Sequence, residues 1–322
     1  FLQEMHQAVM AKHDLVTVGE TPGATTDDAK KYANLEQTEL NMVFEFEHVG
    51  LDGNDNPALG KWSDKKVSLP ELRDNLVKWQ TQLSGKAWNS LYWNNHDQPR
   101  VVSRFGNDDP KYRVVSAKML ATMLHCLQGT PYIYAGEELG MTFNSLSDYR
   151  DLESINAYHQ LVDEEHLVDG KTMSRYLAIH SRDNARTPMQ WDDSKNAGFS
   201  DAEPWIAVNP NYSEINAKAA LADPSSVFYH YQKLIQMRHD LPVMTEGKFA
   251  LVNGNELDEQ VFAYTRDDGE TTLLVVTNFT KETITREYAA GQGKLLLSNY
   301  EDDMGETLRP YEAKVYEFSS KG

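Results

Sequence analysis

A dense group of polar residues, N-N-H-D at positions 94–97, follows an apolar and aromatic run that we expect to form a buried strand over 88–93. Pro99 ends the group and Arg100 follows it. Such residues suit a core poorly, because each buried polar group needs a hydrogen-bond partner. A hydrogen-bonded loop would also satisfy them. The more informative interpretation is a binding site for a polar ligand.

Two carboxylates, Glu20 and Asp97, each follow a short apolar run and could form a two-carboxylate site. Glycoside hydrolysis uses such a pair, about 5–5.5 Å apart in retaining enzymes and further apart in inverting ones. One of the two must stay protonated, so its site should raise its pKa. Glu20 lies among apolar and small residues, which suits the acid, whereas His96 and Arg100 near Asp97 suit an ionised carboxylate. Trp, Tyr and Asn near the strand ends suit a sugar ligand.

Other chemistries lack their sequence signatures. The chain has no G-x-S-x-G sequence for acyl transfer by serine. Glu20, His48, His96 and Asp97 could ligate a metal, but no H-E-x-x-H or comparable spacing occurs, and we expect no metal and no cofactor. The segment that starts at Asp52 resembles a calcium loop only superficially, because its sixth and twelfth positions are Pro and Ser instead of Gly and Glu.

The elements that would position these residues alternate along the chain. We expect strands over 15–19, 41–46, 88–93 and 131–135, separated by helices that begin at Thr25 and span 69–83 and 112–128. Strands of about five or six residues alternating with helices predict parallel pairing, and the carboxyl ends of the strands in a (β/α)8 barrel carry the active site. A doubly wound open sheet would place its ligand at the same edge, but the glycine-rich phosphate loop usual there is absent.

Four strands make half of such a barrel, so we expect the C-terminal half of a (β/α)8 TIM barrel over residues 1–240. Residues 1–13 have helical apolar spacing, as though the chain began inside a larger fold. The segment 141–226, after the last of these strands, is too long for a plain loop and should be functional or partly structured. From 241 to 322, short strands and a D-D-G turn at 267–269 predict a small antiparallel all-β, sandwich-like domain.

Composition limits the possible partners. The 322 residues carry a formal charge of −18, which disfavours nucleic acid and anionic membrane surfaces. No apolar run approaches the roughly 18–20 residues that a membrane span needs. The single cysteine, Cys126, lies in an apolar helical stretch, as expected of a core thiol in a reducing compartment. This composition suits a cytoplasmic protein. We also expect a monomer, and the residues near the strand ends point to a small oligosaccharide substrate as its partner.

The segments 18–23, 93–100 and 129–141 overlap three of the predicted strands, with the sequences V-G-E-T-P-G, W-N-N-H-D-Q-P-R and G-T-P-Y-I-Y-A-G-E-E-L-G-M. Together they resemble the α-amylase family (glycoside hydrolase family 13), most closely its intracellular oligo-1,6-glucosidase and glucan 1,6-α-glucosidase branch. The segment 93–100 resembles the seventh-strand motif of this family. The segment 18–23 resembles the fifth-strand motif, and 129–141 resembles the eighth strand. The segment 182–191 also matches. Because the motifs occur in the family's order, the resemblance is highly specific, and it implies a retaining, exo-acting α-glucosidase.

The resemblance also implies roles for individual residues. Glu20 corresponds to the general acid/base. Asp97 corresponds to a third carboxylate, which binds sugar hydroxyls and stabilises the oxocarbenium-like transition state. His96 corresponds to a sugar-binding histidine beside it. Arg186 corresponds to a subsite arginine from the long segment after the eighth strand. Two further candidates would bind the leaving glucose: Lys61 and Glu153.

The same resemblance corrects the two-carboxylate pairing. In this family the nucleophile is an aspartate at the end of the fourth strand, which would lie before Phe1, so the chain alone is expected to be inactive. The residue after that aspartate often separates α-1,6 from α-1,4 specificity. Trehalose-6-phosphate hydrolase, α-1,4-glucosidase and sucrose isomerase therefore remain alternatives to an α-1,6-glucosidase. A non-catalytic family member that acts as a binding partner is disfavoured, because Glu20, His96 and Asp97 are all present.

Overall fold

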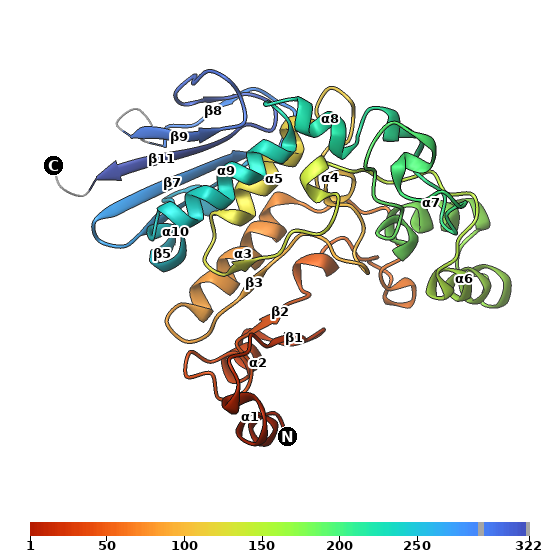
Figure 1. The fold of residues 1–322 in the computed structure, drawn as a ribbon, viewed down its shortest axis with the longest axis horizontal. Helices are drawn as coiled ribbons and strands as arrows, with labels where there is room; N and C mark the ends of the chain where they lie inside the picture. The colour runs from red at the N-terminus through yellow and green to blue at the C-terminus, as the bar shows by residue number, and fades with distance from the viewer. Residues whose placement is uncertain (289–292, 320–322) are drawn as a thin grey trace.

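Strands and helices alternate along the first part of the chain, and an antiparallel sheet forms its last part (Figure 1). The computed structural model describes residues 1–288 and 293–319. The predicted C-terminal domain over 241–322 therefore includes residues that lie outside the described ranges. Within those ranges, no helix is both long and apolar enough to cross a membrane.

Four short parallel strands lie side by side in chain order: β1 (Val18–Glu20), β2 (Met42–Phe44), β3 (Ser90–Leu91) and β4 (Thr130–Pro131). β1 pairs with β2, and β3 pairs with β4, both in parallel. A parallel bridge between Val43 and Asn89 joins the two pairs. Because consecutive strands of the chain are neighbours, their carboxyl ends meet at one edge, as in a barrel.

Helices follow the strands: α2 (Thr26–Tyr32) after β1, α3 (Leu69–Leu83) after β2, α4 (Val101–Arg104) and α5 (Arg113–His125) after β3, and α9 (Val227–Asp240) and α10 (Val243–Glu246) after β4. The sequence explains where α3 begins, because the Ser68 side chain accepts a hydrogen bond from the Glu71 backbone N–H and Pro70 fits the first turn. The prediction of half a (β/α)8 barrel is confirmed.

Two predicted features differ from the structure. The sequence predicts strands of about five or six residues, whereas each hydrogen-bonded ladder spans two or three. The predicted helix over 1–13 consists of α1 (Leu2–Ala8) and the 3₁₀ helix η1 (Met10–Lys12), and neither contains a buried residue. Helical spacing specifies a long helix only where another element packs on the apolar stripe. Here Met5 and Val9 of that stripe are exposed.

The long segment over 141–226 is partly helical. Its α-helices are α6 (Leu152–Tyr158), α7 (Gly170–His180) and α8 (Ala217–Ala222), and the π-helical η5 (His159–Glu164) continues α6. Figure 1 shows α6 and α7 at the end of the molecule far from the C terminus. The remaining short helices are η2 (His48–Gly50), η3 (Pro57–Leu59), η4 (Glu137–Leu139), η6 (Arg182–Asn184), η7 (Lys195–Gly198), η8 (Pro210–Ser213) and η9 (Asn255–Leu257).

The C-terminal part contains a five-stranded antiparallel sheet in the order β5-β6-β7-β11-β9. Its strands are β5 (Lys248–Leu251), β6 (Val261–Asp267), β7 (Thr271–Asn278), β9 (Lys294–Ser298) and β11 (Ala313–Ser319). β8 (Ile284–Thr285) and β10 (Thr307–Leu308) form a separate antiparallel pair. Gly269, at φ +90°, lies in the predicted turn between β6 and β7, where a left-handed conformation favours glycine. The predicted antiparallel β-structure is confirmed.

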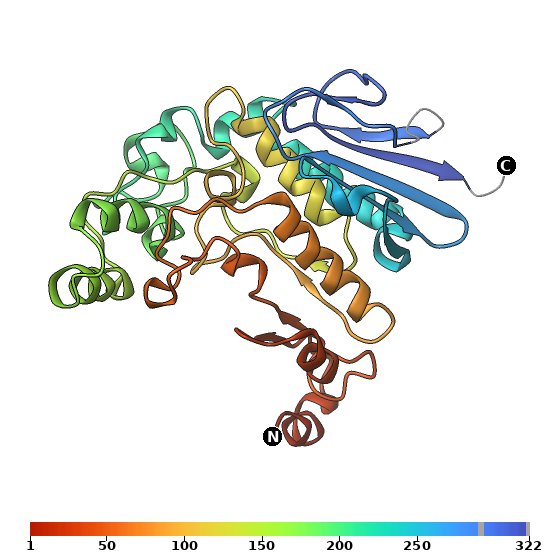
Figure 2. The same cartoon turned by 180° about the vertical axis from the view of Figure 1, so that it is seen from behind.

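This sheet packs on α5 and α10, on the side of α5 away from β1 and β2 (Figure 2). The Tyr264 hydroxyl donates to the Met123 carbonyl at 2.9 Å. The fully buried Arg266 donates to the carbonyls of Cys126 at 2.8 Å and Met244 at 2.9 Å. Burial raises the pKa of the Cys126 thiol to about 12, so it is a neutral core thiol, as predicted. Hydrogen bonds and a shared apolar core therefore hold the sheet against the strand-and-helix part.

Candidate active site

A cavity of about 310 Å³ lies at the carboxyl ends of the parallel strands. Its polar lining includes Glu20, the last residue of β1, and His96, from the segment after β3. Aromatic rings form most of the remaining wall: Phe44, Phe46, Tyr92, Tyr132 and Tyr134. An aromatic cavity with a few convergent polar groups is typical of a small-molecule site. The strand register positions Glu20 directly opposite Phe44 of β2.

Several rings of the aromatic wall pack against one another. The Phe44 ring packs edge-on against Tyr92 and Tyr132, with centroids 5.2 and 4.6 Å apart. The Tyr92 hydroxyl donates to the Glu45 carbonyl at 2.6 Å. Burial, together with the negative charges of Glu45 and Glu20, raises the pKa of Tyr92, so the phenol stays neutral. The cavity thus offers apolar ring faces beside one exposed carboxylate, that of Glu20.

Asp97 lies next to His96 and is held by two arginines from the long segment. Arg186 Nη2 donates to Asp97 Oδ1 at 2.6 Å, and Arg186 Nε donates to the His96 carbonyl at 2.9 Å. Arg182 Nε forms a longer ion pair, 3.4 Å from the same Oδ1. The other carboxylate oxygen, Oδ2, lies 3.7 Å from His96 Nε2. The two arginines therefore orient Asp97 through one oxygen.

The same network continues to the two residues predicted at the leaving-group side. Glu153 Oε2 lies 3.1 Å from Arg182 Nε and 2.7 Å from Lys61 Nζ. The Arg182 Nε contacts are ion pairs without hydrogen-bond alignment. Arg182 was not among the predicted site residues. It precedes Arg186 by four positions, the spacing that places two side chains on one helical face, and this was the signal that could have identified it.

Five of the six predicted site residues thus belong to one network of contacts: Lys61, His96, Asp97, Glu153 and Arg186. Glu20 shares the cavity wall with His96. The predicted neighbour Arg100 behaves differently. It is buried and donates to the Ala135 carbonyl at 2.5 Å, and the arginines that form ion pairs with Asp97 are Arg182 and Arg186 instead. Sequence proximity misled here, because the Arg100 guanidinium instead lies 5.2 Å from the centroid of the Tyr134 ring.

Other polar residues near the strand ends have structural contacts. Glu47 accepts hydrogen bonds from Asn75 at 3.0 Å and Trp79 at 2.8 Å. His48 is buried and lies 3.0 Å from the Tyr92 carbonyl. The buried Asp52 forms an ion pair with Arg104 at 2.7 Å. Among the described residues no group of three or more His, Cys, Asp or Glu side chains is arranged to hold a metal ion.

Comparisons with known proteins agree with this geometry. The α-glucosidase of Pediococcus pentosaceus is 54% identical over 325 residues, which cover 99% of this chain and 58% of that protein. The oligo-1,6-glucosidase of Halalkalibacterium halodurans is 51% identical over 328 residues, which cover 98% and 57%. The solved structure of Bacillus licheniformis trehalose-6-phosphate hydrolase matches with a TM-score of 0.89 at 42% identity, over 99% of this chain and 59% of that one.

This chain therefore spans a little over half the length of the relatives that it matches. The family model described as alpha amylase, catalytic domain, matches residues 1–247. That match covers the four parallel strands, the aromatic cavity and the Asp97 network. The predicted resemblance is confirmed, and the chain belongs to the α-amylase family of glycoside hydrolases.

Proposed function

We propose that this chain supplies the general acid/base and the transition-state-stabilising carboxylate of a retaining, exo-acting α-glucosidase. The proposed substrates are isomalto-oligosaccharides, cleaved at α-1,6-glucosidic bonds. The observation that carries the proposal is the placement of Glu20 and His96 in one aromatic cavity, with Asp97 beside His96 and oriented by Arg186. The family resemblance implies that the attacking aspartate lies outside this chain.

Glu20 takes the acid/base role. Glu20 is the last residue of β1 and is exposed at the cavity, where its carboxyl group can reach the oxygen of a scissile bond. In the first step it would donate its proton to the leaving oxygen. In the second step the carboxylate would remove a proton from water as the glycosyl intermediate is hydrolysed.

Asp97 and His96 act on the glucose ring itself. With Oδ1 of Asp97 engaged by Arg186, the oxygen Oδ2 beside His96 is oriented to accept hydrogen bonds from sugar hydroxyls. Such bonds strengthen as positive charge develops at the anomeric carbon. The aromatic wall would cover the apolar ring face and exclude water.

Lys61, Glu153 and Arg182 favour a neutral leaving sugar. Trehalose-6-phosphate hydrolase is the competing assignment, because a solved relative carries that name. To bind the phosphate group of trehalose 6-phosphate, the site would need positive charge that is not already paired with a carboxylate. Here Lys61 lies 2.7 Å from Glu153, and Arg182 is shared between Glu153 and Asp97. These ion pairs offset the positive charge and leave hydrogen-bonding groups suited to hydroxyls.

The test is a substrate comparison with the whole enzyme. Initial rates of glucose release are measured on isomaltose, maltose and trehalose 6-phosphate, and proton NMR identifies the first anomer formed. The proposal predicts the highest kcat/KM on isomaltose and α-glucose as the first product. Preference for trehalose 6-phosphate or maltose would overturn the α-1,6 assignment, and β-glucose as the first product would overturn retention.

A further inference from the structure

A second concave site lies outside the Glu20 cavity. A groove of about 520 Å³ lies between residues 143–150 and residues 203–210, two stretches of the long segment. Small-molecule sites commonly measure about 300–1,000 Å³. Its lining shares no described residue with the cavity that contains Glu20. The catalytic proposal leaves this groove without a role.

Two buried asparagines tie the walls of the groove together. Asn144 Nδ2 donates to the Ala207 carbonyl at 2.9 Å, and Asn209 Nδ2 donates to the Phe143 carbonyl at 3.0 Å. Each asparagine belongs to one wall and bonds the backbone of the other, and both are at most 5% exposed. Buried amide bonds of this kind fix the spacing between the walls. The groove is therefore formed before any ligand arrives.

Trp205 is the exposed large apolar side chain among the described residues that line the groove. It is 68% exposed, an unusual position for so large an apolar side chain. The loop before it is held by Asn196, whose Nδ2 donates to the carbonyls of Ser200 and Ala202, both at 2.9 Å. Asn196 and Ala197 both adopt left-handed backbone conformations, at φ 55° and 58°. Residues held in such sparsely populated backbone conformations cluster at functional sites.

The polar groups around Trp205 favour a neutral ligand rich in hydroxyls. Arg150 is paired with Asp148 at 2.8 Å, so its charge is compensated. Glu203 adds a further carboxylate, and the chain as a whole carries a charge of −18. Negative charge repels phosphorylated ligands and nucleic acid. Carboxylates, amides and a flat indole together match a pyranose, which presents hydroxyls at its edge and an apolar face.

The groove adjoins the Asp97 network through residues 182–186. Asn184 Oδ1 accepts from the Asn144 backbone N–H at 2.7 Å, and Asp183 Oδ2 accepts from the Arg150 backbone N–H at 2.5 Å. The flanking Arg182 and Arg186 contact Asp97. One short segment thus borders both the groove and the proposed glucose site.

We propose that the groove between 143–150 and 203–210 is a second carbohydrate-binding site, which binds an oligosaccharide by stacking one sugar ring on Trp205. The identity of the sugar as an isomalto-oligosaccharide rests on the proposed function. The bound sugar is either the far end of a long substrate or a separate molecule. Binding experiments distinguish these two sources.

The experiment compares Trp205→Ala with Trp191→Ala in the whole enzyme. Trp191 is also exposed but does not line the groove, so it is a matched control. Both are combined with Glu20→Gln to slow turnover during the titration. Isothermal titration with isomaltose and isomaltohexaose is expected to show that only Trp205→Ala loses a site or weakens isomaltohexaose binding by about tenfold or more. Loss of one binding site indicates that the groove binds a separate sugar molecule. Weaker binding of isomaltohexaose, with unchanged binding of isomaltose, indicates that the groove binds the far end of a long substrate.

Equal isomaltohexaose affinity and stoichiometry in the Trp205→Ala, Trp191→Ala and parent proteins would overturn the proposal. Trp205→Phe keeps an aromatic face and should retain binding, which separates loss of stacking from loss of folding. Failure of the proposed function is distinguishable, because it appears as an altered substrate preference in the turnover assay. The titration needs no turnover and reports on the groove alone.

Discussion

At the scale of single residues, the two oxygens of the Asp97 carboxylate have different surroundings. Oδ1 accepts the short bond from Arg186 and lies near Arg182, while Oδ2 faces His96. Arg186 also binds the His96 carbonyl, so one guanidinium fixes both the side chain of Asp97 and the backbone of its neighbour. A lysine cannot reproduce this two-point contact, because it lacks the planar arrangement of donors.

Arg186→Lys in the whole enzyme should therefore lower kcat/KM on isomaltose by about 100-fold, through loss of preorganisation around Asp97. Steady-state kinetics measure the effect. Arg175→Lys is the matched control, since Arg175 forms an exposed ion pair with Asp64 at 3.4 Å and touches no proposed site residue. Equal activity of the two variants would show that Arg186 does not orient Asp97.

The buried Glu137 is expected to make the free energy of unfolding depend on pH. It is 4% exposed, Tyr231 donates to its Oε1 at 2.6 Å, and burial raises its pKa from 4.5 to about 8. Between those two values the folded protein keeps a proton that the unfolded chain has lost. The stabilising contribution of the protonated form is complete below about pH 4.5 and is lost as the pH rises through about 8.

Glu137→Gln should flatten this dependence. In the parent protein the free energy of unfolding is expected to fall by up to about 1.4 kcal/mol per pH unit between about pH 6.5 and 8. Urea unfolding across that range measures the slope. The buried His125 and His230 titrate lower, with pKa values of about 3. The exposed Glu164→Gln is the control, and an unchanged slope in Glu137→Gln would refute the assignment.

At the scale of elements, the sequence predicted the order and type of the strands better than their length. Tyr92 and Trp93 belong to the predicted strand 88–93 and are buried, yet the ladder of β3 ends at Leu91. Trp93 instead donates through Nε1 to the Leu120 carbonyl of α5 at 2.8 Å. A run of apolar residues therefore indicates burial, and the buried residues can either pair in a strand or pack against a helix. Spacing alone cannot separate the two.

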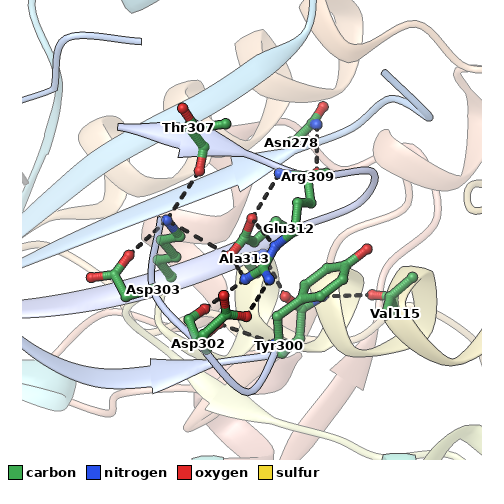
Figure 3. A network of polar contacts seen from close by, with 12 residues as sticks. Val115, Asn278, Tyr300, Asp302, Asp303, Thr307, Arg309, Glu312 and Ala313 are labelled. Atoms are coloured by element: carbon green, nitrogen blue, oxygen red, sulfur yellow. Dashed lines mark hydrogen bonds and ion pairs between the residues drawn. The ribbon is translucent and has the colours of Figure 1, made fainter. Parts of the chain in front are cut away.

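The C-terminal sheet contains a buried ion network that anchors β11 (Figure 3). Lys314 Nζ lies 2.8 Å from Asp303 Oδ1 and donates to the Thr307 carbonyl at 3.2 Å. Arg309 Nη2 donates to Glu312 Oε1 at 2.7 Å. The side chains of Lys314 and Glu312 are fully buried. Breaking one partner of such a network leaves an uncompensated buried charge.

Lys314→Met is accordingly expected to cost roughly 3–5 kcal/mol of stability. Lys294→Met is the control on the neighbouring strand β9. Its side chain is 75% exposed and lies 3.7 Å from Glu317, so its loss should cost about 0–1 kcal/mol. Urea unfolding followed by circular dichroism measures both. Similar small losses in the two variants would mean that the buried network does not stabilise the sheet.

At the scale of the whole molecule, the proposed site joins parts of the chain that are far apart in sequence. Asp97 follows β3, whereas Arg182, Arg186 and Glu153 come from the long segment after β4. The alternation of strands and helices predicted which residues meet at the strand ends. It could not predict how the long segment folds back, because that path depends on its own packing and bonds. Arg186 and Glu153 of this segment were predicted only through the family resemblance, and Arg182 was missed although its spacing of four from Arg186 could have identified it.

The central claim is that Glu20 protonates the leaving oxygen in a site shared with Asp97, and leaving-group dependence tests it most directly. In the whole enzyme, kcat/KM is measured for Glu20→Gln on isomaltose and on an aryl α-glucoside with a good leaving group, with the exposed Glu36→Gln as control. General acid catalysis predicts a loss of about 10³-fold on isomaltose and of less than about tenfold on the aryl glucoside. Equal losses on both substrates would contradict the account.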